Sequence, residues 1–300
     1  MMNDHEYDCY KKAGQIAAEA RDYGVTLLKP GALYTDIANT VEDRIIKKGA
    51  GIAFPVNIAV NELAAHYTPF EGDTSKIEKG DLVKLDVGAH VQGYIADTAV
   101  TIEIGTQKQQ PLIEAARQAL ENAIAEVKEG ASLSHIGQTI EQTITTKGYH
   151  PIDNLTGHSL EQYNLHSGIS VPNIGSSLGG GSIPADTVIA IEPFATPGVG
   201  HVSSSGGSNI YRIGGGMRSR LVRDQRSRHQ LAQMTKQFRT LPFAQRWCAS
   251  QFSSVDRTLK RLTMIGAVKH YPQLIEKTKG LVAQAEHTVI VTPDGCEVTT

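Results

Sequence analysis

The chain has 300 residues, of which 40% are hydrophobic and 20% are charged, and its formal net charge is −2. This is the composition of an ordinary globular protein, and no apolar run approaches the roughly 18 residues of a membrane-spanning helix. Three cysteines far apart do not form a disulfide framework, and the charged N-terminal stretch does not resemble a signal peptide, so we expect a cytoplasmic protein.

Two segments of the chain are similar to each other. Residues 29–49 read KPGALYTDIANTVEDRIIKKG and residues 128–148 read KEGASLSHIGQTIEQTITTKG, with nine identities in 21 positions. Apolar residues at every third or fourth position predict an amphipathic helix in each segment. Another helix is expected before each, over about 8–28 and 111–128, the second opened by a proline. The pattern indicates an internal duplication.

The ends of the two repeated helices have recognisable signals. Thr35 and Ser134 are the expected N-caps, since a hydroxyl can accept a hydrogen bond from the first turn. Gly49 and Gly148 are the expected C-terminal stops, because glycine adopts the left-handed conformation there without strain.

An acidic hairpin follows the first helix pair. Residues 80–105 read GDLVKLDVGAHVQGYIADTAVTIEIG, which predicts two apolar strands joined by a short turn. A turn centred on Val91 and Gln92 places Asp86 directly opposite Asp97. Because like charges at directly opposed positions destabilise a sheet, this pair requires a compensating partner.

The duplication continues into the strands of the second half. GDLVKLD ends at Asp86 and ADTVIAIE ends at Glu192, while IADTAVTI contains Asp97 and QAEHTVIVT contains Glu286. The two acids of the second half are 94 residues apart instead of 11, so about 80 residues have been inserted between its strands. We therefore predict a duplicated α+β architecture with one enlarged hairpin.

The insertion is strongly basic. Between Ser205 and Ile265 there are ten arginines, two lysines, two aspartates and no glutamate, a net charge of +10. Two interpretations of this charge remain open. It forms a solvated helical face with arginine stems covering apolar surface, or it contacts nucleic acid.

If the two halves pack about a pseudo-twofold axis, their four carboxylates converge. Four buried carboxylates cannot all stay ionised without compensation. They share a proton, or two flank a glycosidic bond as acid and nucleophile, or they bind divalent cations. His158 and His166 favour cations, because an oxygen-rich set with one imidazole suits manganese, iron, cobalt or zinc. His66, on an apparent loop, is a candidate for orienting the substrate.

Five stretches of the chain, in order and in register, resemble the methionine aminopeptidases: FPVNIAVNELAAHYTP, LDVGAHVQGYIADTAVT, GHSLEQYNLHSGISVPN, AIEPFAT and AEHTVIVTPDG. The large insertion before Glu286 resembles the type II group, and the lack of an N-terminal extension resembles its archaeal members. The resemblance spans nearly the whole chain.

This resemblance implies an α/β pita-bread fold with two pseudo-twofold-related halves and an inserted helical, winged-helix-like subdomain. The implied division is a catalytic domain of residues 1–204 plus 281–300 and a basic insert of residues 205–280. The implied ligands of two divalent metal ions are Asp86 on one ion, Asp97 and Glu286 as bridges, and His158 with Glu192 on the other.

The implied activity is that of a metalloexopeptidase that removes the N-terminal methionine from nascent proteins and peptides with a small second residue. In the family a metal-bridged hydroxide attacks the first peptide bond. The resemblance assigns catalytic roles to His66, His166 and Glu192, the two histidines also contacting substrate. Phe54 and Leu165 are candidates for the methionine pocket, although plain core packing explains Phe54 equally well.

Two rival functions stay open at this point. A proline-directed aminopeptidase or prolidase would use the same fold and similar ligands with a different pocket. A non-catalytic pita-bread protein would bind the ribosome or nucleic acid, but such a protein is expected to lose ligands, and none is missing here. A basic insert near the ribosomal exit would attract phosphates and favour encounters with nascent chains. We expect a monomer, because no sustained coiled-coil pattern is present.

Overall fold

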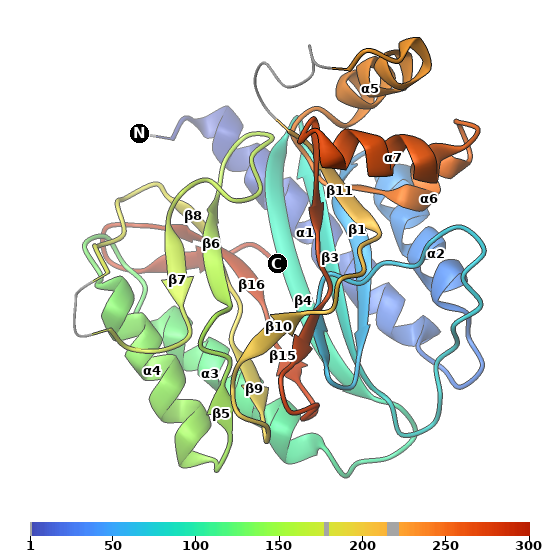
Figure 1. The fold of residues 1–300 in the computed structure, drawn as a ribbon. Helices are drawn as coiled ribbons and strands as arrows, with labels where there is room; N and C mark the ends of the chain where they lie inside the picture. Colours follow the sequence, from blue (N-terminus) through green and yellow to red (C-terminus); the bar gives the residue numbers. More distant parts are fainter. Residues whose placement is uncertain (1, 177–179, 215–221) are drawn as a thin grey trace.

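The computed structural model describes residues 2–176, 180–214 and 222–300. Its first lobe is a sheet with strand order β1-β3-β4, covered on one face by two helices (Figure 1). Apolar side chains of the helices and strands form one continuous cluster between these layers. The elements are α1 (Asp4–Leu27), α2 (Tyr34–Lys47), β1 (Gly51–Val60), β3 (Leu82–Val91) and β4 (Tyr94–Glu103).

The second lobe repeats this plan. Two helices pack on a sheet with strand order β17-β16-β8-β6-β7, and a second apolar cluster fills the space between them. The elements are α3 (Gln110–Ala125), α4 (Leu133–Thr146), β6 (Thr156–Leu160), β7 (Ser170–Pro172), β8 (Val188–Ile191), β16 (His287–Val291) and β17 (Cys296–Val298). The predicted duplication and α/β pita-bread fold are confirmed.

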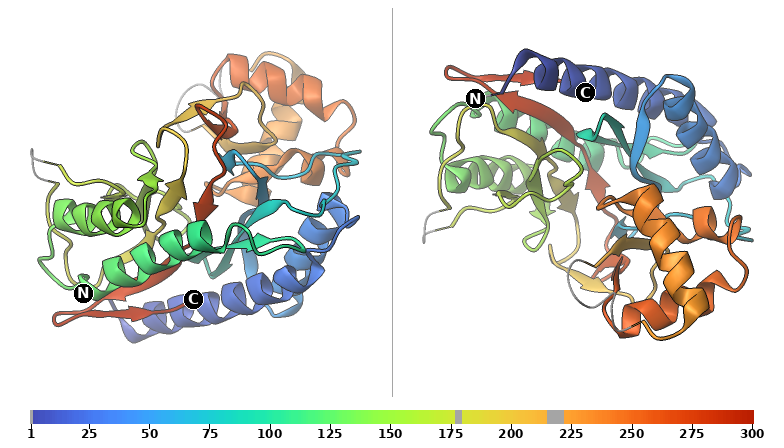
Figure 2. Two further views of the ribbon diagram at one scale, coloured as in Figure 1. Left: turned by 90° about the horizontal axis from the view of Figure 1, so that it is seen from below. Right: turned by 90° about the horizontal axis from the view of Figure 1, so that it is seen from above.

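The two lobes meet along β4 and the chain just before β16. Ala99 and Glu286 exchange backbone hydrogen bonds in both directions, with N···O distances of 3.0 and 3.4 Å. The Thr288 hydroxyl accepts from the Asp97 amide and donates to the Asp97 carbonyl oxygen, both at 2.8 Å. A smaller sheet lies beside this junction and contains β5 (His150–Pro151), β9 (Phe194–Thr196) and β15 (Ala283–Gln284). The views from below and above show the lobes side by side along this seam (Figure 2).

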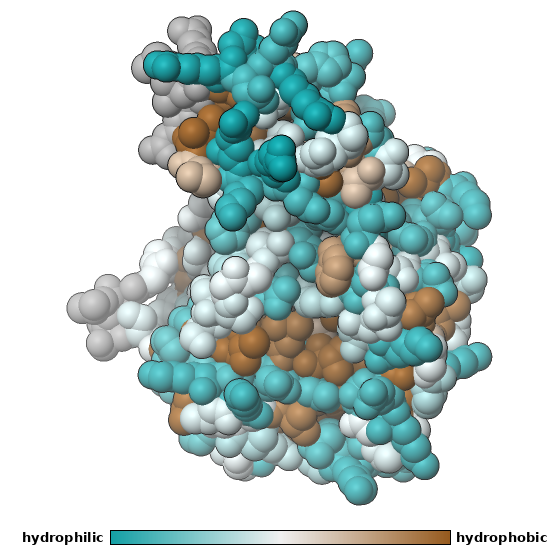
Figure 3. Space-filling model, turned by 45° about the vertical axis from the view of Figure 1, so that its right-hand side comes forward, coloured by the Kyte–Doolittle hydropathy of each residue, from teal (hydrophilic) through white to brown (hydrophobic). Residues whose placement is uncertain are grey.

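The segment inserted between the strands of the second lobe, residues 205–280, has its helices beyond the end of the first lobe's sheet (Figure 1). In the described part of this segment, three strands and three helices surround an apolar cluster of their own. They are β11 (Ile210–Ile213), α5 (Gln225–Phe238), β12 (Phe243–Ala244), α6 (Gln245–Ala249), α7 (Val255–Met264) and β13 (Val268–Tyr271). The view in Figure 3 shows mostly hydrophilic side chains on this segment, at the top. Its definition as a separate domain stays a prediction, and Arg218 and Arg220 of the basic run lie outside the described residues.

A short sheet joins the insert to the first lobe. It contains β10 (Val202–Ser204) and β14 (Leu274–Glu276), and β14 pairs in turn with β2 (Leu63–Ala65). Among the described residues, no helix is both long enough and apolar enough to cross a lipid bilayer.

A buried ion pair also connects the insert to the first lobe. The Arg246 guanidinium on α6 pairs with the Glu42 carboxylate on α2, and both side chains are only 5% exposed. The Glu42 carboxylate also accepts from Trp247 Nε1 at 2.8 Å and from the backbone N–H of Val56 at 3.0 Å. Arg246 donates in addition to Thr68 Oγ1 at 3.1 Å. All of these groups are therefore satisfied, which a buried charge requires.

The predicted C-terminal stops of the repeated helices are confirmed, but the predicted N-caps are wrong. Gly49 and Gly148 have φ angles of 84° and 83°, in the left-handed region. Helix α4 is capped two residues earlier than expected, by the Ser132 hydroxyl accepting from the His135 amide at 3.4 Å. Helix α2 has Leu33 at its N-cap and no side-chain cap there.

The acidic hairpin has a different register from the one predicted. Its turn is centred on Gln92 and Gly93, whose φ angles are 54° and 92°, because this tight turn needs two residues in the left-handed region. Asp86 consequently pairs with Ala99, and Asp97 pairs with Gly88. The two aspartates are diagonal neighbours, and a shift by two positions leaves both side chains on the same face of the sheet.

Candidate metal centre

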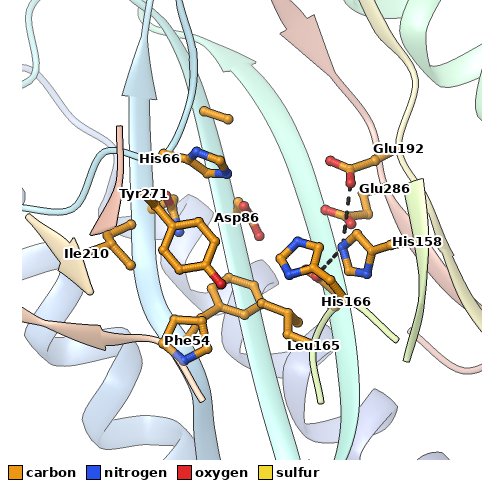
Figure 4. A pocket seen from close by; sticks show the side chains of 14 residues that line it. Phe54, His66, Asp86, His158, Leu165, His166, Glu192, Ile210, Tyr271 and Glu286 are labelled. Carbon is orange, nitrogen blue, oxygen red and sulfur yellow. Dashed lines mark ion pairs between the residues drawn. The ribbon is translucent and has the colours of Figure 1, made fainter. Parts of the chain in front are cut away.

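The structure brings together all four carboxylates singled out in the sequence (Figure 4). Asp86 and Asp97 point from β3 and β4 into one pocket. Glu192, directly after β8, and Glu286, directly before β16, enter it from the second lobe. The lobe junction at Ala99 and Glu286 therefore sets the distance between the two acidic pairs.

His158 completes this cluster from β6. Its Nε2 lies 3.7 Å from Asp97 Oδ2 and 3.6 Å from Glu192 Oε1. One possible ligand atom from each of Asp97, His158 and Glu286 lies within 4.8 Å of the other two. A divalent cation between them would reach all three with only small side-chain movements.

Burial makes the cluster electrostatically unfavourable without a cation. Desolvation raises the pKa of Asp86 to about 7. Desolvation, and then the charge of neighbouring carboxylates, raises the pKa of Asp97, Glu192 and Glu286 well above their ordinary values. Burial lowers the pKa of the His158 imidazole to about 3, so this ring is a neutral ligand at pH 7.

The hydrogen bonds within the cluster also fit cation binding. Oδ1 of Asp86 and Oδ1 of Asp97 are buried and have no hydrogen-bond partner among the described residues. Such atoms are costly unless something binds them, and anionic oxygens with one imidazole nitrogen are the donors that manganese, iron, cobalt and zinc accept. The residues present therefore fit a divalent metal centre.

Two polar residues beside the cluster were missed in the sequence. The Gln284 amide donates to Glu286 Oε2 at 3.3 Å and to Glu192 Oε2 at 3.4 Å, which links the two acids of the second lobe. Asn57 on β1 is directly paired with Asp86 and is 4% exposed. Each is a polar residue in an otherwise apolar strand near a candidate ligand, and this pattern is visible in the sequence alone.

Two further histidines border the pocket. His66 directly follows β2, has a φ of 66° and its Nδ1 lies 3.1 Å from the carbonyl oxygen of Pro272. Because this contact fixes Nδ1, Nε2 is the nitrogen left for other partners. The ring of His166 lies 4.3 Å from the ring of His158, centroid to centroid. Burial lowers the pKa of His66, and it lowers the pKa of His166 to about 4.

Tyr271 stands between these histidines. Its ring centroid lies 5.3 Å from that of His66 and 6.1 Å from that of His166. It comes from β13 of the insert, so no local pattern near the other site residues indicates it.

The remaining wall of the pocket is apolar and contains Phe54, Leu165, Ile210 and Pro242. Phe54 packs against the backbone of Gly88, where a Cβ would lie 2.1 Å from a Phe54 ring carbon. Glycine at this position therefore allows the ring to lie across β3 beside the acids. The pocket thus combines a cation site with an adjoining apolar slot.

Comparison with known proteins places this arrangement among peptidases. The family description "Metallopeptidase family M24" matches residues 8–293. A methionine aminopeptidase of Thermococcus kodakarensis is 45% identical over 297 residues, covering 98% of this chain and 99% of the relative. One of Archaeoglobus fulgidus is 42% identical and covers 100% of both chains. The crystal structure of a methionine aminopeptidase from Thermotoga maritima superposes with a TM-score of 0.73 at 23% identity, covering 100% of this chain and 98% of the other.

Proposed function

Because the chain belongs to metallopeptidase family M24, we propose that it removes the N-terminal methionine from nascent proteins and peptides with a small second residue. The observation that supports this most directly is the junction of the lobes. There, four carboxylates and an imidazole adjoin an apolar slot and two further histidines. Relatives named methionine aminopeptidase match at 40–45% identity over the whole chain. The protein is a metal-dependent hydrolase of the pita-bread fold.

The cofactors are two divalent metal ions, and cobalt, manganese, iron and zinc all suit the donors. The residues that would hold them are Asp86, Asp97, His158, Glu192 and Glu286. Asp97 and Glu286 are the proposed bridging ligands, since each lobe provides one of them beside the junction. When bound, such ions supply Lewis acidity and lower the pKa of a water molecule.

The catalytic proton transfer is assigned to Glu192. Its carboxylate enters the pocket near His158, where it can accept a proton and pass it to the leaving amine. His66 and His166 face the same pocket from other walls and are assigned to the developing negative charge on the scissile carbonyl oxygen. The contact between His66 Nδ1 and Pro272 aligns the ring for this task.

Substrate contacts are assigned to both histidines and to the apolar wall. Phe54 and Leu165 are 5% and 8% exposed, and with Ile210 and Pro242 they line a slot that suits a thioether side chain. A small second residue is expected because the Tyr271, His66 and His166 rings surround the next position.

Removal and replacement of metal tests this function. After chelation, hydrolysis of Met-Ala-Ser should fall to the background rate, and separate addition of manganese, iron, cobalt or zinc should restore it, because the ions supply the Lewis acid. The measurement is release of free methionine, with an Ala-Pro peptide as the comparison substrate. Faster cleavage of Ala-Pro than of Met-Ala-Ser would indicate a proline-directed enzyme, and no cleavage with any metal would contradict the proposed function.

We propose that the protein is a cytoplasmic monomer and that it encounters nascent chains at the ribosome. The support is the +10 charge of residues 205–265, which attracts phosphate groups. Co-sedimentation with ribosomes is expected to decrease steeply as salt rises from 50 to 200 mM. If the protein does not bind ribosomes, or binds them independently of salt, the arginines form only a solvated surface.

A further inference from the structure

The sheet of the insert, β12-β11-β13, has two chemically distinct faces. Tyr211 and Ile213 pack against the insert's apolar cluster, whereas Ile210 and Tyr271 line the catalytic pocket. Side chains alternate between the faces of a strand. Arg212, two positions after Ile210, therefore lies on the face that looks towards the catalytic pocket.

Lys269 is the partner of Arg212 across the β11–β13 ladder, two positions before Tyr271, so it shares this face. Two cations directly opposite each other destabilise a sheet unless an anion lies between them. Within the part of the chain that the structure describes, neither side chain forms an ion pair. The sequence of residues 215–221, which follow β11, contains no acidic residue. Arg212 is half-buried and Lys269 is exposed, so an incoming anion can reach both.

A second pocket connects Arg212 to the metal centre. Its lining is Asn164, Leu165, His166, Arg212, Thr240 and Tyr271, and three of these residues also line the catalytic pocket. A peptide whose first residue occupies the apolar slot can therefore continue past His166 and Tyr271 towards Arg212.

We infer that Arg212 and Lys269 form a subsite for a carboxylate of the substrate peptide, beyond its second residue. The inference rests on the proposed aminopeptidase function and adds a preference for acidic sequences to it. An extended peptide advances roughly 3.3 Å per residue, so the side chains that can reach this face are those that follow the second residue past His166 and Tyr271. The chain-terminal carboxylate of a short peptide offers the same chemistry.

Paired peptide amides test this subsite with the metal-loaded full-length protein. The kcat/KM for Met-Ala-Asp-Ala-amide should exceed that for Met-Ala-Asn-Ala-amide by about two- to fivefold at low salt, the range of a partly exposed ion pair. Arg212→Gln should bring this ratio to about one, and Arg212→Glu should bring it below one. Lys269→Gln should lower the ratio less, because Lys269 is more exposed. Raised salt should reduce the preference of the unchanged protein.

A control variant and a second pair of peptides complete the test. Lys260→Gln removes an exposed cation of α7 and should leave the ratio unchanged. Met-Ala-Asn-Ala is also measured as the free acid and as the amide. If the free acid has the higher kcat/KM while the Asp and Asn amides are cleaved equally well, the terminal carboxylate is the ligand. An Asp/Asn ratio of one in the unchanged protein with no gain for the free acid, or a preference that survives Arg212→Glu, overturns the subsite. Absence of cleavage of every peptide would instead contradict the proposed function.

Discussion

Replacing Asp97 by asparagine is expected to lower kcat/KM for Met-Ala-Ser by more than about 100-fold, because even outer-shell partners of metal ligands contribute 10- to 100-fold. Asp97 provides ligand atoms close to both His158 and Glu286, so its loss weakens the site from both lobes. The change is nearly isosteric, which leaves the packing intact. The measurement is steady-state hydrolysis with saturating metal.

The same substitution should stabilise the metal-free protein, although it lowers the activity of the metal-loaded enzyme. Burial and neighbouring carboxylates raise the pKa of Asp97 above its ordinary value of 3.8, so its ionisation costs the folded state free energy at pH 7. Asp97→Asn should therefore raise the Tm of the metal-free protein at pH 7. The gain should vanish near pH 3, where the carboxyl is protonated in both folded and unfolded chains.

Asp153→Asn is the control for this prediction, since Asp153 is an exposed partner of His201 outside the pocket. It should change neither activity nor the stabilisation by added metal. If Asp97→Asn retained both hydrolysis and metal-induced stabilisation, the proposed bridging role would be wrong.

Replacing Arg246 by methionine is expected to lower the free energy of unfolding by about 3–5 kcal/mol, the usual cost of leaving one partner of a buried ion pair alone. Glu42 would remain buried between α2 and α6 with its charge unpaired. Urea denaturation of the metal-free protein measures this loss. KM should also rise, because Glu42 fixes the Val56 amide between the pocket residues Phe54 and Asn57.

An exposed ion pair provides the matched comparison. Arg117 pairs with Glu114 on the surface of α3, and Arg117→Met should cost only about 0–1 kcal/mol. The double variant Glu42→Gln/Arg246→Met should be more stable than Arg246→Met alone, since no unpaired charge remains. Equal stability of the single and double variants would mean that the Arg246 side chain acts through packing only.

Two kinds of feature could be predicted from the sequence: segments that recur along the chain, and residues that are unusual for the strand in which they lie. The helix pairs were found because the segment ending at Gly49 recurs in the segment ending at Gly148. Asp86 and Asp97 were found because aspartate is unusual in apolar strands. Such signals are local, and they indicated acids that the structure brings into one pocket, even though the hairpin register was wrong by two positions.

The features that sequence reasoning missed depend on contacts between distant segments. Tyr271 reaches the pocket only because the insert folds back over the first lobe, and no spacing rule connects it with His66. Ser132 and Ser134 satisfy the residue preference for a helix N-cap equally well, and only the position at which helix α4 begins decides between them. The Glu42–Arg246 pair is separated by 204 residues and leaves no local pattern.

The bridge between Ala99 and Glu286 has a consequence for biosynthesis. It joins residues 187 positions apart, and contacts of such separation require the closure of a long loop, so we expect them to form slowly. A partly synthesised chain has Asp86 and Asp97 but no Glu192 or Glu286 to complete the set. Assembly of the complete set of candidate metal ligands therefore requires the second lobe, up to Glu286, to be synthesised and folded.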